Sequence, residues 1–274
     1  MGAGRGIAMD KTSLLDRLRA DGDERLLLSR ILDRQRQSQS HGAPVCTDFL
    51  SPREQALASE LLRLSHAPDD SYLLTGGVAD AERKIICFLP DWMSPDALAP
   101  DDLPLCAVRA AWRDGETLSH RDLLGGLMGL GIVRGKIGDI YVSADSADVL
   151  ILDSLLEFLK QSWTSAGRAK LQVSEIPLDA VRVPARQVQE IRDTVSSVRL
   201  DAVIASGFRL SRSKAAELVS AGRVQVNWLD CAKPDRVLQP GDSVSARGFG
   251  RFTLSRVGEP TRKGRIPIFI ARYL

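Results

Sequence analysis

Basic side chains gather at the start of one expected helix in the last third of the chain. Ser211 is placed to cap a helix whose apolar face includes Ala215 and Leu218. Arg212 and Lys214 fall in its first turn, where a positive charge opposes the helix dipole. That arrangement becomes favourable when a phosphate binds there, because free N–H groups and two cations then converge on one anion. An ordinary solvated turn accounts for this feature alone equally well.

Two more arginines flank a glycine-containing turn further along. The alternating residues 224–227 and 243–247 predict strands of a hairpin, which leads into Arg247-Gly-Phe-Gly-Arg251. Gly248 and Gly250 let the backbone come close to a ligand between the two arginines. The same part of the chain therefore carries two groups of cations suited to an anionic partner.

The charge of the chain is unevenly distributed. Over 274 residues the formal net charge is +2, which by itself says nothing about partners. Residues 182–274 contain 17 Lys and Arg against 8 Asp and Glu, whereas residues 1–181 contain 20 against 27. A basic C-terminal third on an acidic body is typical of a tethered nucleic-acid-binding module, with a chance basic surface as the alternative.

Cysteine and histidine spacing argues against a metal site or a disulfide framework. The cysteines contain no C-x-x-C pair and are Cys46, Cys87, Cys106 and Cys231. The histidines lie far apart in sequence, at His41, His66 and His120. We therefore expect no metal, no cofactor and a reducing, cytoplasmic environment, with assembly of the histidines in space as the open alternative.

A cluster of glycines in the middle of the chain does not have the pattern of a phosphate-binding loop. Gly125, Gly126, Gly129 and Gly131 fall inside or at the end of an expected helix, not after a strand in the G-x-G-x-x-G order. This pattern favours close helix packing, with Gly131 as the C-cap, over a phosphate-binding loop.

The sequence also gives no sign of a membrane partner. No window approaches the roughly 20 apolar residues of a membrane span, and no signal-peptide pattern is found, so no membrane partner is expected.

Four regions are expected along the chain. With 44% hydrophobic and 26% charged residues, the composition is that of an ordinary globular protein. Residues 1–70 predict a helical region, in which Ser51-Pro-Arg-Glu54 is a strong helix start. Residues 71–176 predict an α+β domain, residues 177–196 a connector, and residues 197–274 a C-terminal domain ending in a strand.

Residues 71–176 alternate between strand and helix patterns. The order strand, strand, helix, strand, strand, helix, strand begins with strands at 72–75 and 84–89. This order fits a compact α+β domain with one sheet and helices on one face, in a ferredoxin-like or RRM-like arrangement. The aromatic base-stacking signature of an RRM is missing, so we do not expect base stacking on this sheet.

Short motifs in the basic third resemble the S4 RNA-binding domain. In chain order they are Arg199-Leu-Asp201, Ser211-Arg-Ser-Lys214, Gly222-Arg-Val-Gln-Val-Asn227, Lys233-Pro234, Gly241-Asp242 and Arg247-Gly248. The resemblance implies that paired helices and an adjoining hairpin form a basic surface that grips structured RNA. The implied RNA-binding residues are Arg199, Arg209, Ser211, Arg212, Lys214, Arg223, Lys233, Arg247 and Arg251. The resemblance also implies that Asp201 and Asn227 stabilise the fold rather than touch RNA.

Further motifs along the chain are similar to those of the YlmH family, a group of bacterial S4-domain proteins. They are Asp48-Phe-Leu-Ser-Pro52, Gly76-Gly77 followed by Ala81-Glu-Arg83, the segments 122–132 and 135–140, and Thr261-Arg-Lys-Gly-Arg265. This resemblance implies an acidic body with an RRM-like domain, an S4 module and binding to ribosomal or transfer RNA on the large ribosomal subunit. Related S4 proteins assist quality control on stalled subunits that carry peptidyl-tRNA, so the resemblance implies this role too.

Enzymes also carry S4 domains, which keeps other functions open. A pseudouridine synthase would have its Arg-Leu-Asp motif in a separate catalytic domain, whereas Arg199-Leu-Asp201 belongs to the S4-like segment. Neither the nucleotide-binding motifs of a tyrosyl-tRNA synthetase nor the glycine-rich loop of a methyltransferase is found. We expect a non-catalytic, monomeric RNA-binding protein. An RNA-modifying enzyme and an adaptor in ribosome assembly or cell division are the alternatives.

Overall fold

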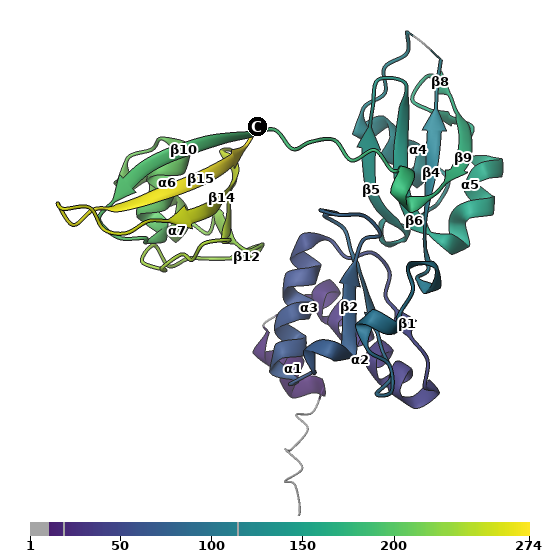
Figure 1. The fold of residues 1–274 in the computed structure, drawn as a ribbon, viewed down its shortest axis with the longest axis horizontal. Coiled ribbons are helices and arrows are strands. Elements are labelled where there is room, and N and C mark those ends of the chain that lie inside the picture. The colour runs from purple at the N-terminus through teal and green to yellow at the C-terminus, as the bar shows by residue number, and fades with distance from the viewer. Residues whose placement is uncertain (1–10, 19, 114) are drawn as a thin grey trace, which may run out of the picture. The chain divides into compact units, whose positions relative to one another are not determined.

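The computed structural model describes residues 11–18, 20–113 and 115–274, and these form two compact units. The N-unit is Met1–Pro184 and the C-unit is Ala185–Leu274 (Figure 1). The C-unit holds 16 Lys and Arg against 8 Asp and Glu, and the N-unit holds 21 against 27. The division of charge expected from the sequence therefore follows the division into units.

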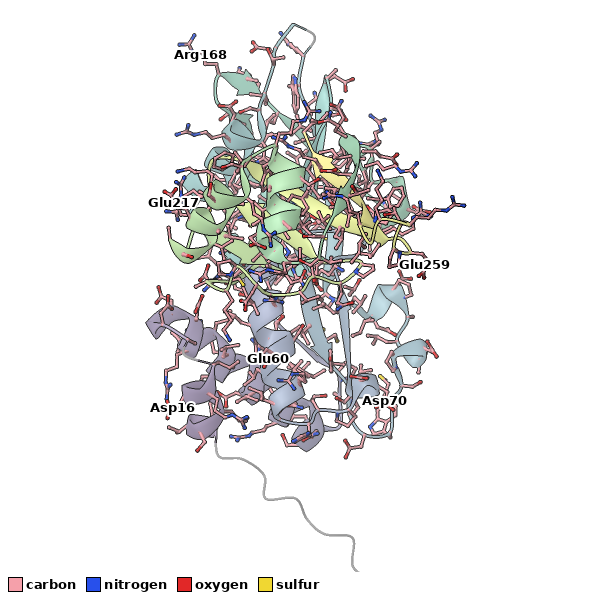
Figure 2. The ribbon with its side chains drawn as sticks, turned by 90° about the vertical axis from the view of Figure 1, so that its left-hand side faces the viewer. Asp16, Glu60, Asp70, Arg168, Glu217 and Glu259 are labelled. Atoms are coloured by element: carbon pink, nitrogen blue, oxygen red, sulfur yellow. The ribbon has the colours of Figure 1, made fainter. Side chains whose placement is uncertain are left out.

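The N-unit begins with three helices and a small sheet. The helices are α1 (Lys11–Arg17), α2 (Gly22–His41) and α3 (Pro52–Leu64), and the strands are β1 (Val45–Cys46), β2 (Tyr72–Thr75) and β3 (Ile85–Phe88). Ser51 and Glu54 form the expected capping box at the start of α3. The strands pair antiparallel in the order β1-β3-β2. Figure 2 labels Asp16, Glu60 and Asp70 on this part of the chain.

The position of β2 and β3 corrects the expectation of one sheet over residues 71–176. These two strands pair with each other, and β3 also pairs with β1. Neither strand pairs with the strands that follow. All four residues of β3 are buried, and a continuous apolar run does not indicate which sheet a strand joins. The strand that decides the pairing, β1, has only two residues and leaves no alternation in the sequence.

The second half of the N-unit has the topology expected for an RRM-like domain. Its elements are β4 (Leu105–Ala111), α4 (His120–Gly129), β5 (Ile137–Val142), β6 (Ser146–Leu152), α5 (Leu156–Ser162) and β9 (Gln172–Ile176). The strands pair antiparallel in the order β5-β6-β4-β9, which is the ferredoxin-like order. A short hairpin of β7 (Ser165–Ala166) and β8 (Ala169–Lys170) follows α5. The α+β fold class is confirmed, with a narrower domain than expected.

Both faces of this sheet are covered. On one face Val108 and Val149 pack with residues of α4 and α5 in one hydrophobic cluster. On the other face Phe49 and Ile85, from the first half of the N-unit, pack with Leu150. All seven residues of β6 are buried as a result. An RRM binds RNA on an open sheet face, so the structure agrees with the expectation that no bases stack here.

The C-unit is a sheet of six strands with two helices. Its elements are β10 (Val188–Val195), α6 (Leu200–Phe208), α7 (Arg212–Ser220), β11 (Val224–Val226), β12 (Leu229–Asp230), β13 (Ser243–Ala246), β14 (Gly250–Val257) and β15 (Ile266–Tyr273). The strand order is β10-β15-β14-β13-β11-β12. Val203 of α6 and Leu218 of α7 share one buried core with Phe252 and Ile270 of the sheet.

The expected connector at residues 177–196 is only partly a connector. Leu178 and Val181 pack against the N-unit cluster around Phe49, whereas β10 pairs along its whole length with β15. The C-unit therefore begins at Ala185 rather than at residue 197. The strand was missed because its sequence is mostly polar and its partner lies more than 70 residues further on.

Candidate RNA interface

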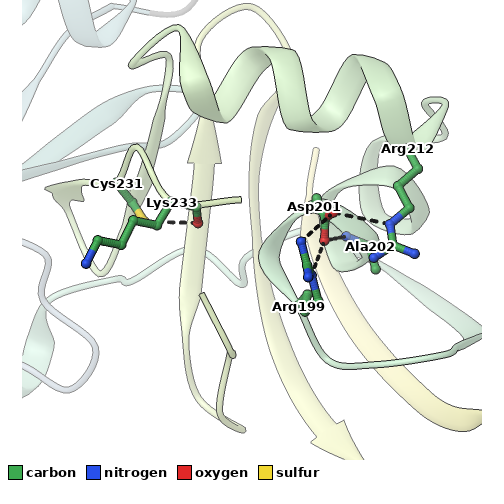
Figure 3. Close-up of polar contacts among 6 residues, drawn as sticks. All are labelled: Arg199, Asp201, Ala202, Arg212, Cys231 and Lys233. Atoms are coloured by element: carbon green, nitrogen blue, oxygen red, sulfur yellow. Dashed lines mark hydrogen bonds and ion pairs between the residues drawn. The ribbon is translucent and has the colours of Figure 1, made fainter. Parts of the chain in front are cut away.

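A buried carboxylate joins the start of α6 to the start of α7 (Figure 3). Asp201 is 5% exposed, and its backbone neighbour Ala202 donates an N–H to Oδ1 at 2.9 Å. Nε of Arg199 lies 3.2 Å from Oδ1, and Nε of Arg212 lies 3.2 Å from Oδ2. Burial by itself would raise the pKa of Asp201. The hydrogen bonds and charges of the two guanidinium groups outweigh that effect and hold the pKa below its ordinary value.

The two arginines of this cluster face solvent while Asp201 fixes them. The side chains of Arg199 and Arg212 remain 38% and 51% exposed. An anchored guanidinium loses little conformational entropy when it binds a phosphate, and its planar fork can donate several N–H groups. The structure therefore brings together two of the predicted residues, from either side of α6, as one positioned pair of cations.

The start of α7 agrees with the capping expected from the sequence. Ser211 is the N-cap, and its Oγ accepts the backbone N–H of Lys214 at 3.2 Å. Lys214 is exposed, and its Nζ lies 3.1 Å from Glu217 one turn later. Arg209, two residues before Ser211, is the C-cap of α6. It is exposed and has the left-handed conformation, with φ +56°. Arg209 and Ser211 thus lie in the short turn between the two helices, and Arg212 and Lys214 lie in the first turn of α7.

A second pair of predicted residues meets between β11 and β13. Arg223 donates from its guanidinium to the carbonyl of Arg247 at 3.0 Å, and the Arg247 N–H donates back to the Arg223 carbonyl at 3.0 Å. Both arginines line a hollow of about 300 Å³ together with Gln225 and Ser245. Asp230 also borders this hollow, so the charge there is mixed rather than purely positive.

Arg251 and Lys233 are not part of these two groups. The Arg251 guanidinium lies over two rings, with Cζ 4.9 Å from the centroid of Trp228 and 4.4 Å from that of Tyr273. Lys233 is exposed in the segment after β12, where its carbonyl accepts the Cys231 thiol at 3.9 Å. Figure 3 shows Lys233 set apart from the Arg199–Asp201–Arg212 cluster.

One further basic residue was not among the predicted set. Arg265, which precedes β15, lines a hollow of about 310 Å³ that also contains Arg212 and Thr194. Its Nε donates to Thr194 Oγ1 at 2.9 Å, and a second guanidinium nitrogen donates to the Thr194 carbonyl. The basic run at residues 261–265 is visible in the sequence, but its proximity to Arg212 depends on the unexpected strand β10.

Asn227 has a structural role in the turn after β11. Its side-chain amide donates to Asp242 at 2.7 Å, and its Oδ1 accepts the backbone N–H of Ser243 at 2.9 Å. Its φ of +51° is in the left-handed region that asparagine tolerates better than most residues. These contacts fix the β11–β12 turn against β13. The S4 resemblance implies that Asn227 and Asp201 stabilise the fold. The contacts of Asn227 and the ion pairs of Asp201 are of that stabilising kind.

Two family models match the chain. The model of the S4 domain matches residues 198–244, and the model described as "Putative RNA-binding domain in YlmH" matches residues 110–180. The first range contains both helices of the C-unit and most of the predicted RNA-binding residues. The second begins within β4 and ends after β9, which is the RRM-like half of the N-unit.

Two similar proteins were found among known sequences and structures. The chain is 36% identical over 244 residues to the "Ribosome-associated protein quality control protein P2" of Bacillus subtilis (strain 168), covering 89% of this chain and 93% of the relative. It is also similar to the solved structure of "Cell division protein ylmH from Streptococcus pneumoniae", at 20% identity and a TM-score of 0.47. That match covers 60% of this chain and 97% of the other.

Proposed function

This chain belongs to the YlmH family, and from that premise we propose that it binds structured ribosomal or transfer RNA through its C-unit, by contacts to phosphates and without catalysis. The observation that carries the proposal is the Arg199–Asp201–Arg212 cluster at the start of two S4 helices. A buried carboxylate there holds two exposed guanidinium groups beside a capped helix N-terminus. Such a group of fixed donors suits a phosphate better than it suits a neutral ligand.

The charge of the whole C-unit supports the same ligand. The C-unit contains twice as many basic as acidic residues, and this excess of positive charge attracts a polyanion. The relative from Bacillus subtilis is named as a ribosome-associated quality control protein. We propose that this chain binds the large ribosomal subunit in the cytoplasm and acts there as a monomer on stalled complexes that carry peptidyl-tRNA. Among the described residues, no helix is long and apolar enough to cross a membrane.

Charge reversal at the start of α7 tests this proposal. The variant Arg212→Glu with Lys214→Glu should lose co-sedimentation with large ribosomal subunits, because two phosphate-binding cations become repulsive. Arg168→Glu with Lys170→Glu changes the net charge by the same amount on the N-unit and should leave co-sedimentation unchanged. Retained binding in the first variant would contradict the proposed surface.

A second variant separates binding from folding. Since Arg212 also pairs with Asp201, its reversal weakens an ion pair within the C-unit. Arg209→Glu with Lys214→Glu leaves that ion pair intact and should still lose subunit binding. Its far-ultraviolet circular dichroism and melting temperature should match those of the unmodified protein. Crosslinking followed by RNA sequencing would identify the RNA element. New nucleoside modifications that appear in unmodified RNA incubated with the pure protein would instead favour an enzyme.

A further inference from the structure

Aromatic and arginine side chains alternate on the face of the C-unit sheet that is turned away from α6 and α7. Along β15, Ile268 and Ile270 are buried in the core shared with the helices, whereas Phe269 and Tyr273 belong to the opposite face. The pairing register places Arg192 of β10 beside Phe269 on one side and Arg256 of β14 on the other. Three adjacent strands therefore contribute one row of cation, ring and cation.

The side chains of this row are in direct contact. Cζ of Arg256 lies 3.9 Å from the centroid of the Phe269 ring, and Cζ of Arg192 lies 5.3 Å from it. Both arginines are exposed, so each guanidinium is held against a ring on one side and open to solvent on another. The nearby stack of Arg251 with Tyr273 and Trp228 continues the same alternation toward the β11–β12 turn. These ring contacts hold both guanidinium groups of the row in position.

A hollow at this row is lined by residues of the three strands β10, β14 and β15. It has a volume of about 540 Å³ and is lined by Glu190, Ile191, Arg192, Ser255, Arg256, Phe269 and Ile270. One of the lining residues, Ser255, lies in β14 where the register shifts between Leu254 and Arg256, and it forms a bulge there. Bulges commonly redirect side chains beside binding sites. The hollow is of the size of small-ligand sites, and two cations and one carboxylate border it.

We infer that this face is a second RNA contact, which takes an unpaired nucleotide. The base stacks on the guanidinium planes held by Phe269, and the flanking phosphates pair with Arg192 and Arg256. Glu190 can accept a hydrogen bond from the Watson–Crick edge of the base. A paired strand offers no free base face, so the ligand is single-stranded.

This site is distinct from the α6–α7 surface. Its residues lie in β10, β14 and β15, outside the residues 198–244 that the S4 model matches. It is on the opposite face of the sheet from the helices, so one RNA can contact both surfaces or two RNA segments can bind at once. The inference rests on the proposed function only in taking the ligand to be RNA.

Calorimetric titration of the full chain with a single-stranded RNA hexanucleotide tests the inference. Arg192→Gln with Arg256→Gln should weaken binding roughly tenfold or more, since stacking of one base is worth that much. The matched control is Arg262→Gln with Lys263→Gln, which removes the same charge from exposed residues of the same unit and should weaken binding much less. Equal losses in the two variants would overturn the site.

A hexamer without bases tells stacking from simple anion binding. It carries the same phosphates, so the inference predicts that it binds roughly tenfold more weakly than the normal hexamer. Phe269→Leu should reduce this difference while leaving the melting temperature nearly unchanged. Equal binding of both hexamers would show a plain anion surface and overturn the inference. If the hexamer fails to bind while ribosomal subunits still bind, only this inference is wrong; if neither binds, the proposed function fails as well.

Discussion

Asp201 shows how one residue determines the geometry of the candidate interface. Its carboxylate accepts from Arg199, from Arg212 and from the backbone of α6, so a single buried charge orients two exposed ones. A guanidinium that is already positioned loses less entropy on binding, so we expect this carboxylate to raise RNA affinity without touching RNA. Its effect on binding should therefore be separable from that of the arginines it holds.

Asp201→Asn should destabilise the C-unit by about 1–3 kcal/mol. The amide keeps the shape but removes the charge, and both partner arginines are partly exposed, which keeps the cost below that of a fully buried pair. The measurement is urea unfolding at neutral pH. An unchanged midpoint would show that the two ion pairs contribute nothing to stability.

Asp201 should also make the stability of the C-unit depend on pH in the acid range. Since the pKa of Asp201 is lower in the folded state than its ordinary 3.8, the stabilisation is complete above that pH and is lost as the pH falls below it. Asp148, paired with Arg109 at 2.6 Å in the N-unit, has a lowered pKa and acts in the same direction. Between pH 6 and pH 2, the free energy of unfolding should change less with pH in the Asp201→Asn variant than in the unmodified protein. A curve parallel to that of the unmodified protein would contradict this assignment.

At the scale of elements, local signals were predictable and distant pairings were not. Ser51 and Ser211 predict the starts of their helices, because an N-cap serine accepts a backbone N–H only three residues further along the chain. In contrast, β10 depends on β15, and β2 and β3 depend on β1, none of which leaves a local pattern. The same limit applies to the site: the basic residues were predictable by type, but the ion pairs on Asp201 and the place of Arg265 required the fold.

Gly138 in β5 allows the two halves of the N-unit to pack together. A Cβ there would lie 2.8 Å from the Phe49 ring and 2.9 Å from Leu150. Gly138→Ala should destabilise the protein by roughly 1–3 kcal/mol, because neither neighbour can move without disturbing the sheet. Gly125→Ala in α4 is the matched control: a Cβ there meets nothing within 4 Å, and loss of a helical glycine should stabilise slightly. Equal melting temperatures for the two variants would contradict this role of Gly138.

The strand β10 belongs to the folding unit of the C-terminal domain. A fragment of residues 185–274 should therefore fold on its own, whereas residues 197–274 lack the partner of β15 and its buried Val195. For a unit of this size, the loss of about 2 kcal/mol would lower the melting temperature by roughly 8–16 °C. Thermal circular dichroism of the two fragments checks this. Identical melting curves would place the boundary at residue 197 after all.

For the whole molecule, the separation of charge predicts how RNA binding responds to salt. If about six phosphates are neutralised by the C-unit, the logarithm of the affinity should fall with the logarithm of salt concentration with a slope of roughly −4 to −5. We expect the acidic N-unit to add no phosphate contacts, in which case a fragment of residues 185–274 gives the same slope. Titration of RNA binding at several salt concentrations measures it. A much shallower slope for the fragment would mean that the N-unit also binds RNA.

The contact between Arg251 and Trp228 has a practical consequence. The other three tryptophans, Trp92, Trp112 and Trp163, all lie in the N-unit, so Trp228 is the single indole of the C-unit. Replacing those three with phenylalanine would leave one fluorophore, whose emission depends on the guanidinium beside it. An RNA strand that draws Arg251 away, or stacks a base near the indole, would change the emission wavelength or quench it. In that variant, Trp228 would report RNA binding at this sheet by its fluorescence.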